Sequence, residues 1–195
     1  MSKDNLNLPK TTSLKVLRDW LPLNTSQSGK STVSEIVFAG FGIQVKKHKK
    51  WEEYDSFTHL DVKGKWIIVL RKLPSQWSQE RKDFYFYNST LRKKASLARD
   101  LGAEGIIFIS SDAENDQVVA FNTTAVNETM SIYSISLKNK FARQIFTLNG
   151  RNLPAICEKL NAGDNLMGFK LDDFQLETNI EIVRDKGECR NILGL

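Results

Sequence analysis

Apolar residues in the middle of the chain form two short unbroken runs, a pattern typical of strands that are buried on both faces. The first lies within residues 65–71, which are apolar inside and basic at both ends, and the second lies within residues 105–110. Between them, residues 89–101 place apolar side chains at helical spacing, and Gly102 follows as a helix stop. Short connections join this strand, helix and strand into a βαβ unit, so we expect the two strands to be parallel.

Weaker patterns on either side predict a mixed α/β fold. Residues 36–43 are rich in β-prone residues, and two glycines within them suggest a bulge or a close backbone approach. Residues 174–183 alternate apolar and polar side chains, which is typical of a strand covered on one face only. Further strands are expected at residues 117–121 and 131–137, and further helices at residues 138–148 and 153–160.

Composition and length favour one domain. The chain has 195 residues, of which 41% are hydrophobic, and this is enough to bury one substantial core. Residues 1–30 are polar and contain prolines, so we interpret them as a lead-in segment. The formal net charge of +5 is moderate and does not imply a nucleic-acid partner. No stretch approaches the roughly 20 apolar residues of a membrane helix, and the first residues lack the apolar run of a signal peptide.

Two segments resemble ligand-binding loops without matching them. Residues 28–32, Ser-Gly-Lys-Ser-Thr, are similar to the end of a phosphate-binding loop, in which the start of a helix holds phosphate. Asn24 occupies the place of the first glycine of that motif, and residues 33–38 are strand-like where the helix should begin. Residues 112–116 gather oxygen ligands, but their spacing is not that of a calcium loop. We therefore expect no nucleotide site at residues 28–32 and a solvated loop at residues 112–116.

His59 and Asp61 are a candidate metal site, because a histidine and a carboxylate two residues apart can both bind zinc. A hydrolytic site needs at least three fixed ligands and an activated water. The other histidine, His48, lies inside a lysine cluster that repels a cation. Cys157 and Cys189 are too few for a disulfide framework, and the sequence leaves open whether they meet. We expect His59 to be a turn residue.

A basic cluster at residues 46–50, beside Trp51, could follow a phosphate backbone and stack a base. The acidic residues Glu52, Glu53 and Asp55 come directly after it and largely cancel its charge. A solvated hairpin tip explains the cluster equally well. We therefore expect no nucleic-acid partner.

Five short motifs follow one another in a characteristic order. They are Val-Phe-Ala-Gly-Phe-Gly-Ile at residues 37–43, Tyr-Asp-Ser-Phe at 54–57, Asp-Val-Lys-Gly-Lys at 61–65, Lys-Ala and Ala-Arg within 94–99, and Gly-Ala-Glu-Gly at 102–105. Their order and spacing resemble the protease-associated domain found in many secreted zinc aminopeptidases. The last two are similar to that family's K-A-x-x-A-R-x-x-G-A helix and the buried strand that follows it.

The resemblance implies a swivelling β/β/α fold, with a mixed sheet or an open β-barrel flanked by helices, over residues 31–189. Residues 190–195 resemble the start of the peptidase domain that follows in such proteins. The zinc ligands of those enzymes lie mostly or wholly after that junction. The resemblance therefore implies that this chain has no catalytic residue, metal ligand or cofactor of its own, that zinc belongs to the neighbouring peptidase domain, and that the parent protein is secreted or in the cell envelope.

The function that the resemblance implies is that of an accessory domain, which covers or shapes a neighbouring peptidase site or binds peptide and protein substrates, without a membrane partner. The expected contact surface is formed by residues 46–54 and 76–87, where aromatic side chains can act as rigid anchors although some must be core. The candidate contact residues are Trp51, Tyr54, Trp77, Phe84 and Tyr85, with Phe86 and Tyr87 beside them. The motif residues expected to shape turns and strand entries are Gly40, Gly42, Asp61, Gly64, Lys65 and Gly102. The alternative is a small metal-dependent hydrolase that uses His59 and Asp61.

Overall fold

The structure is a computed structural model that describes residues 11–48, 51–112, 116–120, 129–164, 166–172 and 175–184. Within these residues the chain has a mixed α/β fold with a six-stranded mixed sheet and four helices. In chain order, the elements are β1 (Trp20–Pro22), β2 (Gly29–Val33), β3 (Ile36–Phe38), β4 (Gln44–Val45), β5 (Tyr54–Asp55), β6 (Trp66–Leu70), α1 (Gln79–Ser89), α2 (Leu91–Asp100), β7 (Gly105–Ile109), β8 (Tyr133–Leu137), α3 (Asn139–Leu148), α4 (Leu153–Ala162), β9 (Phe169–Leu171) and β10 (Leu176–Ile180).

Four parallel strands form the centre of the main sheet, whose strand order is β1-β8-β7-β6-β3-β9. β6 pairs in parallel with β3 on one side and with β7 on the other, and β7 pairs in parallel with β8. All residues of β6 and β7 are buried, as their unbroken apolar sequences predicted. The predicted βαβ unit is confirmed, with α2 lying between β6 and β7 and ending just before Gly102.

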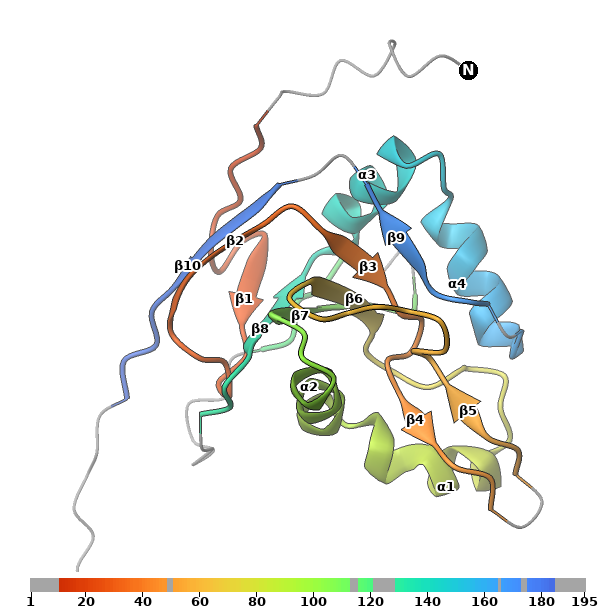
Figure 1. The fold of residues 1–195 in the computed structure, drawn as a ribbon. Helices are drawn as coiled ribbons and strands as arrows, with labels where there is room; N and C mark the ends of the chain where they lie inside the picture. Colours follow the sequence, from red (N-terminus) through yellow and green to blue (C-terminus); the bar gives the residue numbers. More distant parts are fainter. Residues whose placement is uncertain are drawn as a thin grey trace, which may run out of the picture.

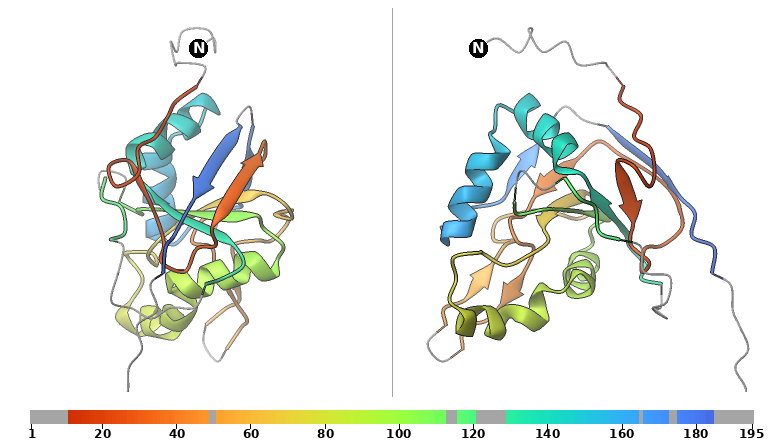
Figure 2. Two further views of the ribbon diagram at one scale, coloured as in Figure 1. Left: turned by 90° about the vertical axis from the view of Figure 1, so that its left-hand side faces the viewer. Right: turned by 180° about the vertical axis from the view of Figure 1, so that it is seen from behind.

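Helices cover both faces of this sheet, as Figures 1 and 2 show. On one face, α2 packs its buried alanines, Ala95 and Ala98, into one hydrophobic core. On the other face, α3 and α4 contribute residues such as Phe146 to a second core. Because successive side chains of a strand point to opposite faces, the neighbours Ile67 and Ile68 belong to different cores.

The edges of the sheet and two smaller sheets complete the fold. β1 pairs antiparallel with β8 at one edge, and β9 pairs antiparallel with β3 at the other. β2 and β10 form a separate two-stranded ribbon, and β4 and β5 form a short hairpin. Alternating burial along β10 confirms a strand covered on one face for residues 176–180. Residues 20–22 and 29–33 are strands already, so ordered structure begins earlier than the expected lead-in of residues 1–30 allows.

Two other sequence predictions need correction. Residues 117–120 form no strand; the main-chain N–H of Val119 instead donates to Ser136 Oγ over 2.9 Å. Phe121, the last residue of that predicted strand, lies outside the described residues. The segment after β6, expected to be a connection, contains α1, whose first turn is capped because Ser78 Oγ accepts from the N–H of Arg81. The predictions of β8, α3 and α4 are confirmed.

Candidate functional site

The two segments expected to form the contact surface pack against each other at one end of the molecule, where the β4–β5 hairpin lies beside α1 (Figure 1). An aromatic cluster joins them. The ring centroid of Trp77 lies 4.9 Å from that of Tyr85 and 5.6 Å from that of Tyr54, and the Phe84 and Tyr85 centroids are 4.9 Å apart. The guanidinium carbon of Arg81 lies 3.7 Å from the Trp77 ring centroid, which is within cation–π range.

Burial divides the aromatic residues into a support and an exposed surface. Trp77 and Tyr85 have only 6% and 0% of their surface exposed, so they are core residues and cannot anchor a partner directly. Phe86 and Tyr87, in the next positions of α1, are 68% and 65% exposed. The most exposed aromatic side chains of the predicted contact surface therefore lie on α1, and the predicted anchor residues Trp77 and Tyr85 pack beneath them as support.

The hairpin is tied to α1 by hydrogen bonding and stacking. The hydroxyl of Tyr85 donates to the main-chain oxygen of Glu52 over 2.9 Å, and the His48 ring stacks on Phe84 at a centroid distance of 5.6 Å. Burial raises the pKa of Tyr54 to about 12. At the hairpin tip, Lys47 Nζ lies 2.8 Å from Glu52 Oε1, so part of the basic charge is already paired within the chain.

A pocket of about 850 Å³ opens at the carboxyl ends of the central parallel strands. Its wall includes Arg71, which follows β6, Ser111, which follows β7, and residues of α1 and α4. Asn161 of α4 holds the two strand-end loops together, because its Nδ2 donates to Ser111 O over 3.0 Å and its Oδ1 accepts from the N–H of Ser75 over 3.2 Å. In open α/β sheets ligands bind in such crevices at the carboxyl ends of the strands.

Lys94 fixes the backbone beside this pocket. Its side chain is fully buried, and Nζ donates to the main-chain oxygens of Leu70 and Arg71 over 2.7 and 3.1 Å. Burial lowers the pKa of Lys94 to about 7, because the protein interior disfavours the charged ammonium group. The end of β6, and with it the position of Arg71, is thus set by a lysine on α2.

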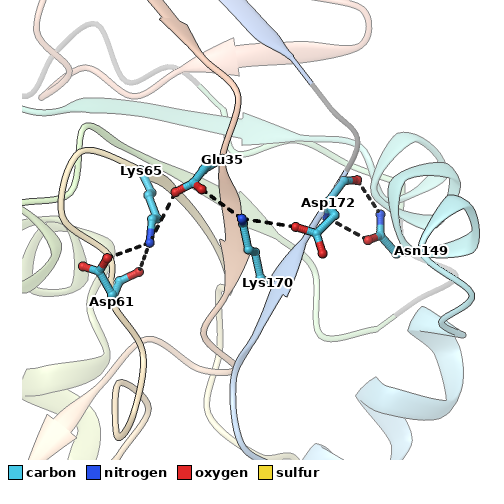
Figure 3. A network of polar contacts seen from close by, with 6 residues as sticks. All are labelled: Glu35, Asp61, Lys65, Asn149, Lys170 and Asp172. Atoms are coloured by element: carbon cyan, nitrogen blue, oxygen red, sulfur yellow. Dashed lines mark hydrogen bonds and ion pairs between the residues drawn. The ribbon is translucent and has the colours of Figure 1, made fainter.

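The opposite end of the sheet carries a chain of ion pairs, drawn in Figure 3. Lys65 Nζ lies 2.8 Å from Asp61 Oδ2 and 3.4 Å from Glu35 Oε2. Lys170 Nζ in β9 lies 2.9 Å from Glu35 Oε1 and 3.3 Å from Asp172 Oδ1. Lys170 and Lys65 lower the pKa of Glu35, and Lys65 lowers the pKa of Asp61. Lys65 therefore joins the start of β6 to Glu35 before β3, Glu35 continues the chain to Lys170 of β9, and Asp61 holds Lys65 in place, which is a structural role.

The four glycines singled out in the sequence motifs share a backbone property. The φ angles of Gly40, Gly42, Gly64 and Gly102 are 51°, 63°, 69° and 83°, a region that side-chain-bearing residues rarely adopt. The N–H of Gly64 donates to Gly102 O over 2.8 Å, which joins the turns before β6 and after α2. These residues shape the scaffold around the two central strands.

The candidate metal residues His59 and Asp61 are not part of a metal-binding cluster of described residues. His59 is exposed in a left-handed turn with a φ angle of 63°, and the Asp61 carboxylate is paired with Lys65. In the part of the chain that the structure describes, no three His, Cys, Asp or Glu side chains lie close enough together to hold a metal ion. Burial raises the pKa of the Cys157 thiol to about 12, while Cys189 lies outside the described residues.

The two loops that resembled ligand sites can be placed only in part. Residues 29–33 form β2, so a strand stands where a phosphate-binding loop needs the start of a helix. Within the acidic segment 112–116, only Asp112 and Asp116 are described, and Asp116 Oδ1 accepts from the N–H of Lys140 over 2.7 Å.

Sequence reasoning missed Arg71, Lys94 and the pocket between them and α4. A signal for Lys94 was present, because it occupies the same helical face as the apolar positions 91, 95 and 98. A lysine at such a position is expected to be buried or to reach over the sheet edge. Arg71 gave no comparable signal, since a basic residue directly after a buried strand is also typical of a solvated loop.

Comparison of the sequence with protein-family models and with curated proteins finds no match. The class that the fold defines is a mixed α/β protein with a six-stranded mixed sheet. Of the helices described, none combines the length and apolar character needed to cross a membrane.

Proposed function

We propose that the chain is a non-catalytic accessory domain of the protease-associated type, which contacts peptides or proteins and works beside a zinc peptidase domain in a secreted or cell-envelope protein. The sequence motifs suggest the family, and the placement of the exposed aromatic residues supports the contact role. One observation carries the proposal. The β4–β5 hairpin contacts α1 through Glu52 and His48, and Phe86 and Tyr87 are exposed on the same helix.

The support beneath these two residues favours recognition by a rigid surface. Tyr85 on the buried side of α1 packs against Trp77, which precedes the helix, and Arg81 lies over the Trp77 ring. Exposed aromatic residues on a rigid element lose little conformational entropy when a partner covers them. The same cluster connects α1 to the hairpin, because Tyr54 of β5 also packs against Trp77.

The isolated chain provides the first test. We expect no hydrolysis of chromogenic aminoacyl substrates, with or without added zinc. A zinc-dependent hydrolysis that is abolished in His59→Ala would overturn the proposal in favour of the metal-dependent hydrolase. The codons after residue 195 provide an independent check, because we expect them to encode the His, Asp, Glu, Glu, Asp and His ligands of a zinc peptidase in that order.

Binding provides the second test. Peptides selected from a phage-displayed random library on the wild-type chain should bind the double variant Phe86→Ser/Tyr87→Ser at least about tenfold more weakly. Leu148→Ser removes an exposed apolar residue on α3 and is the matched control, which should bind like the wild type. Equal binding to all three proteins, or no enrichment of any peptide, would contradict the assigned surface.

A further inference from the structure

The pocket at the carboxyl ends of β6 and β7 contains a positively charged group that has no partner among the described residues. Arg71 is half-buried and lines this pocket. Its guanidinium group forms no hydrogen bond or ion pair with any described residue, and burial alone lowers its pKa. A partly buried charge is costly unless it is paired, so this group is poised to accept an anionic partner.

The main chain of Arg71 is held on both sides. Its N–H donates to Ile109 O over 2.9 Å, and its carbonyl oxygen accepts from Lys94 Nζ over 3.1 Å. The first bond ties it to β7 and the second to α2. A guanidinium group on such a fixed backbone loses less freedom on binding than one on a free loop.

The charge balance of the pocket decides which kind of anion fits. Three basic residues line it, of which Lys82 already donates to Ser75 O over 2.7 Å. Three acidic residues also line it, including Asp83, which accepts from Gln79, and Asp112, which has a partner of its own. Because the formal charges cancel, a polyanion such as a nucleic acid or a polyphosphate is disfavoured. A single carboxylate matches one unpaired guanidinium group, with which it can form two parallel hydrogen bonds.

The remaining wall is compatible with a carboxylate that carries an apolar group. Phe86 of α1 supplies an exposed aromatic face beside the pocket. Thr90, the N-cap of α2, also lines it, so the positive end of that helix dipole adds to the attraction for a negative charge. We propose that this pocket binds a carboxylate-bearing ligand, with Arg71 as its anchor and Phe86 as the apolar wall beside it. The carboxylate can belong to a peptide C-terminus or to a small organic acid.

This inference does not need the protease-associated assignment. It shares Phe86 with the contact surface proposed above, so the decisive variants are those of Arg71, which lies outside that surface. Isothermal titration of the whole chain with N-acetyl-Gly-Phe, and with the same dipeptide as its C-terminal amide, tests the need for the carboxylate. We expect the acid to bind at least about tenfold more tightly than the amide, the effect of losing a charge-assisted hydrogen-bond pair. Phenylacetate distinguishes the two sources, since affinity equal to that of the dipeptide favours a small acid and weaker affinity favours a peptide terminus.

Variants of Arg71 test the anchor. Arg71→Gln should weaken binding of the acid at least about tenfold. Arg71→Lys keeps the charge but not the planar fork, so its affinity should lie between those of the wild type and Arg71→Gln. Arg92→Gln on the exposed side of α2 is the matched control and should bind like the wild type. Circular dichroism shows whether each variant folds. If Arg71→Gln does not fold, the affinity of Arg71→Lys for the acid provides the test. Equal affinity for acid and amide, unchanged binding by the Arg71 variants, or tighter binding of inorganic phosphate than of any acid would overturn the proposal.

Discussion

Lys94 Nζ donates a 2.7 Å hydrogen bond to the main-chain oxygen of Leu70, the last residue of β6. Lys94 lies on α2, so this bond fastens the helix to the carboxyl end of the strand that it covers. Its second hydrogen bond goes to Arg71 O, and within the described residues neither of its acceptors is a carboxylate. Burial therefore lowers the pKa of Lys94 to about 7, since no carboxylate of the described residues offsets it.

This arrangement makes stability depend on pH in the alkaline range. Between the folded-state pKa of about 7 and the ordinary lysine value of 10.5, the unfolded chain binds more protons than the folded chain. The free energy of unfolding should therefore rise with pH across this window, by at most about 1.4 kcal/mol per pH unit, and level off below about pH 7. Chemical denaturation between pH 6 and 10 measures the free energy of unfolding of the wild type and of Lys94→Met. The wild type should gain stability relative to the variant as pH rises.

The control is the adjacent Lys93→Met. Lys93 lies over the Tyr87 ring and does not reach the strand end, so its loss should leave the pH dependence of the wild type in place. If Lys94→Met shows the same alkaline slope as the wild type, another group titrates in this window and the assignment to Lys94 is wrong.

Asp19 predicts a second pH dependence, at the acid end. Its side chain is 1% exposed, and hydrogen bonds from Arg18 and from the N–H of Lys15 lower the pKa of the carboxyl group to about 2. The stability that it contributes is present above the ordinary value of 3.8 and is lost as pH falls towards 2. Asp19→Asn should lower the melting temperature at pH 5. Between pH 4 and pH 2, the melting temperature of this variant should decrease less than that of the wild type.

Asp100→Asn is the matched control for Asp19. Asp100 also pairs with the preceding arginine, at 2.8 Å from Arg99, but its side chain is 59% exposed. Exposed pairs contribute little to stability, so Asp100→Asn should melt close to the wild type. Equal melting curves for Asp19→Asn and Asp100→Asn would show that burial does not strengthen the Arg18–Asp19 pair.

The central βαβ unit could be predicted because its signals are local. Residues 66–70 and 105–109 are apolar without interruption, and the helix between them has a clear periodicity and a glycine stop. β1 could not be predicted in the same way. It has only three residues, and what makes Trp20–Pro22 a strand is pairing with β8, more than a hundred residues later. The signal for α1 was weak but present, since Ser78 precedes an acidic first turn.

For the candidate site, the sequence indicated which segments take part but not which of their side chains are exposed. The aromatic richness of residues 76–87 indicated a surface with anchors, but it could not show which face of α1 is buried, because α1 itself was not predicted. Tyr85 is consequently core, while Phe86 beside it is exposed. The pocket depends on residues from β6, β7, α1 and α4, and their meeting is decided by sheet order, which local patterns do not contain.

Gly42 should tolerate a side chain much less well than Gly64. Both have φ angles near 65°, so alanine at either position suffers similar backbone strain, on the order of 1 kcal/mol. A Cβ atom at Gly42 would lie 2.6 Å from Val69 Cγ1, whereas nothing lies within 4 Å of one at Gly64. Overpacking adds about 1 to 3 kcal/mol to the cost at Gly42.

Urea denaturation of Gly42→Ala and Gly64→Ala separates these two terms. The difference between the variants measures the clash with Val69, because the strain is common to both. A double-mutant cycle checks the contact. Gly42→Ala should destabilise the Val69→Ala protein less than it destabilises the wild type, because the clashing methyl group is then absent. Equal destabilisation of the two glycine variants would show that β6 shifts easily to make room.

Substitution of Trp77 should reduce the stability of the fold, whereas substitution of Phe86 should reduce binding and leave stability almost unchanged. Trp77 is 6% exposed and contacts Tyr54, Tyr85 and Arg81, so Trp77→Ala should destabilise the fold by about 3 to 5 kcal/mol. Phe86 is 68% exposed, and Phe86→Ala should change the free energy of unfolding by no more than about 0.5 kcal/mol. Urea titrations followed by circular dichroism give both values. A large loss of stability in Phe86→Ala would mean that Phe86 supports the fold, and a reduced affinity of that variant would then no longer identify a contact residue.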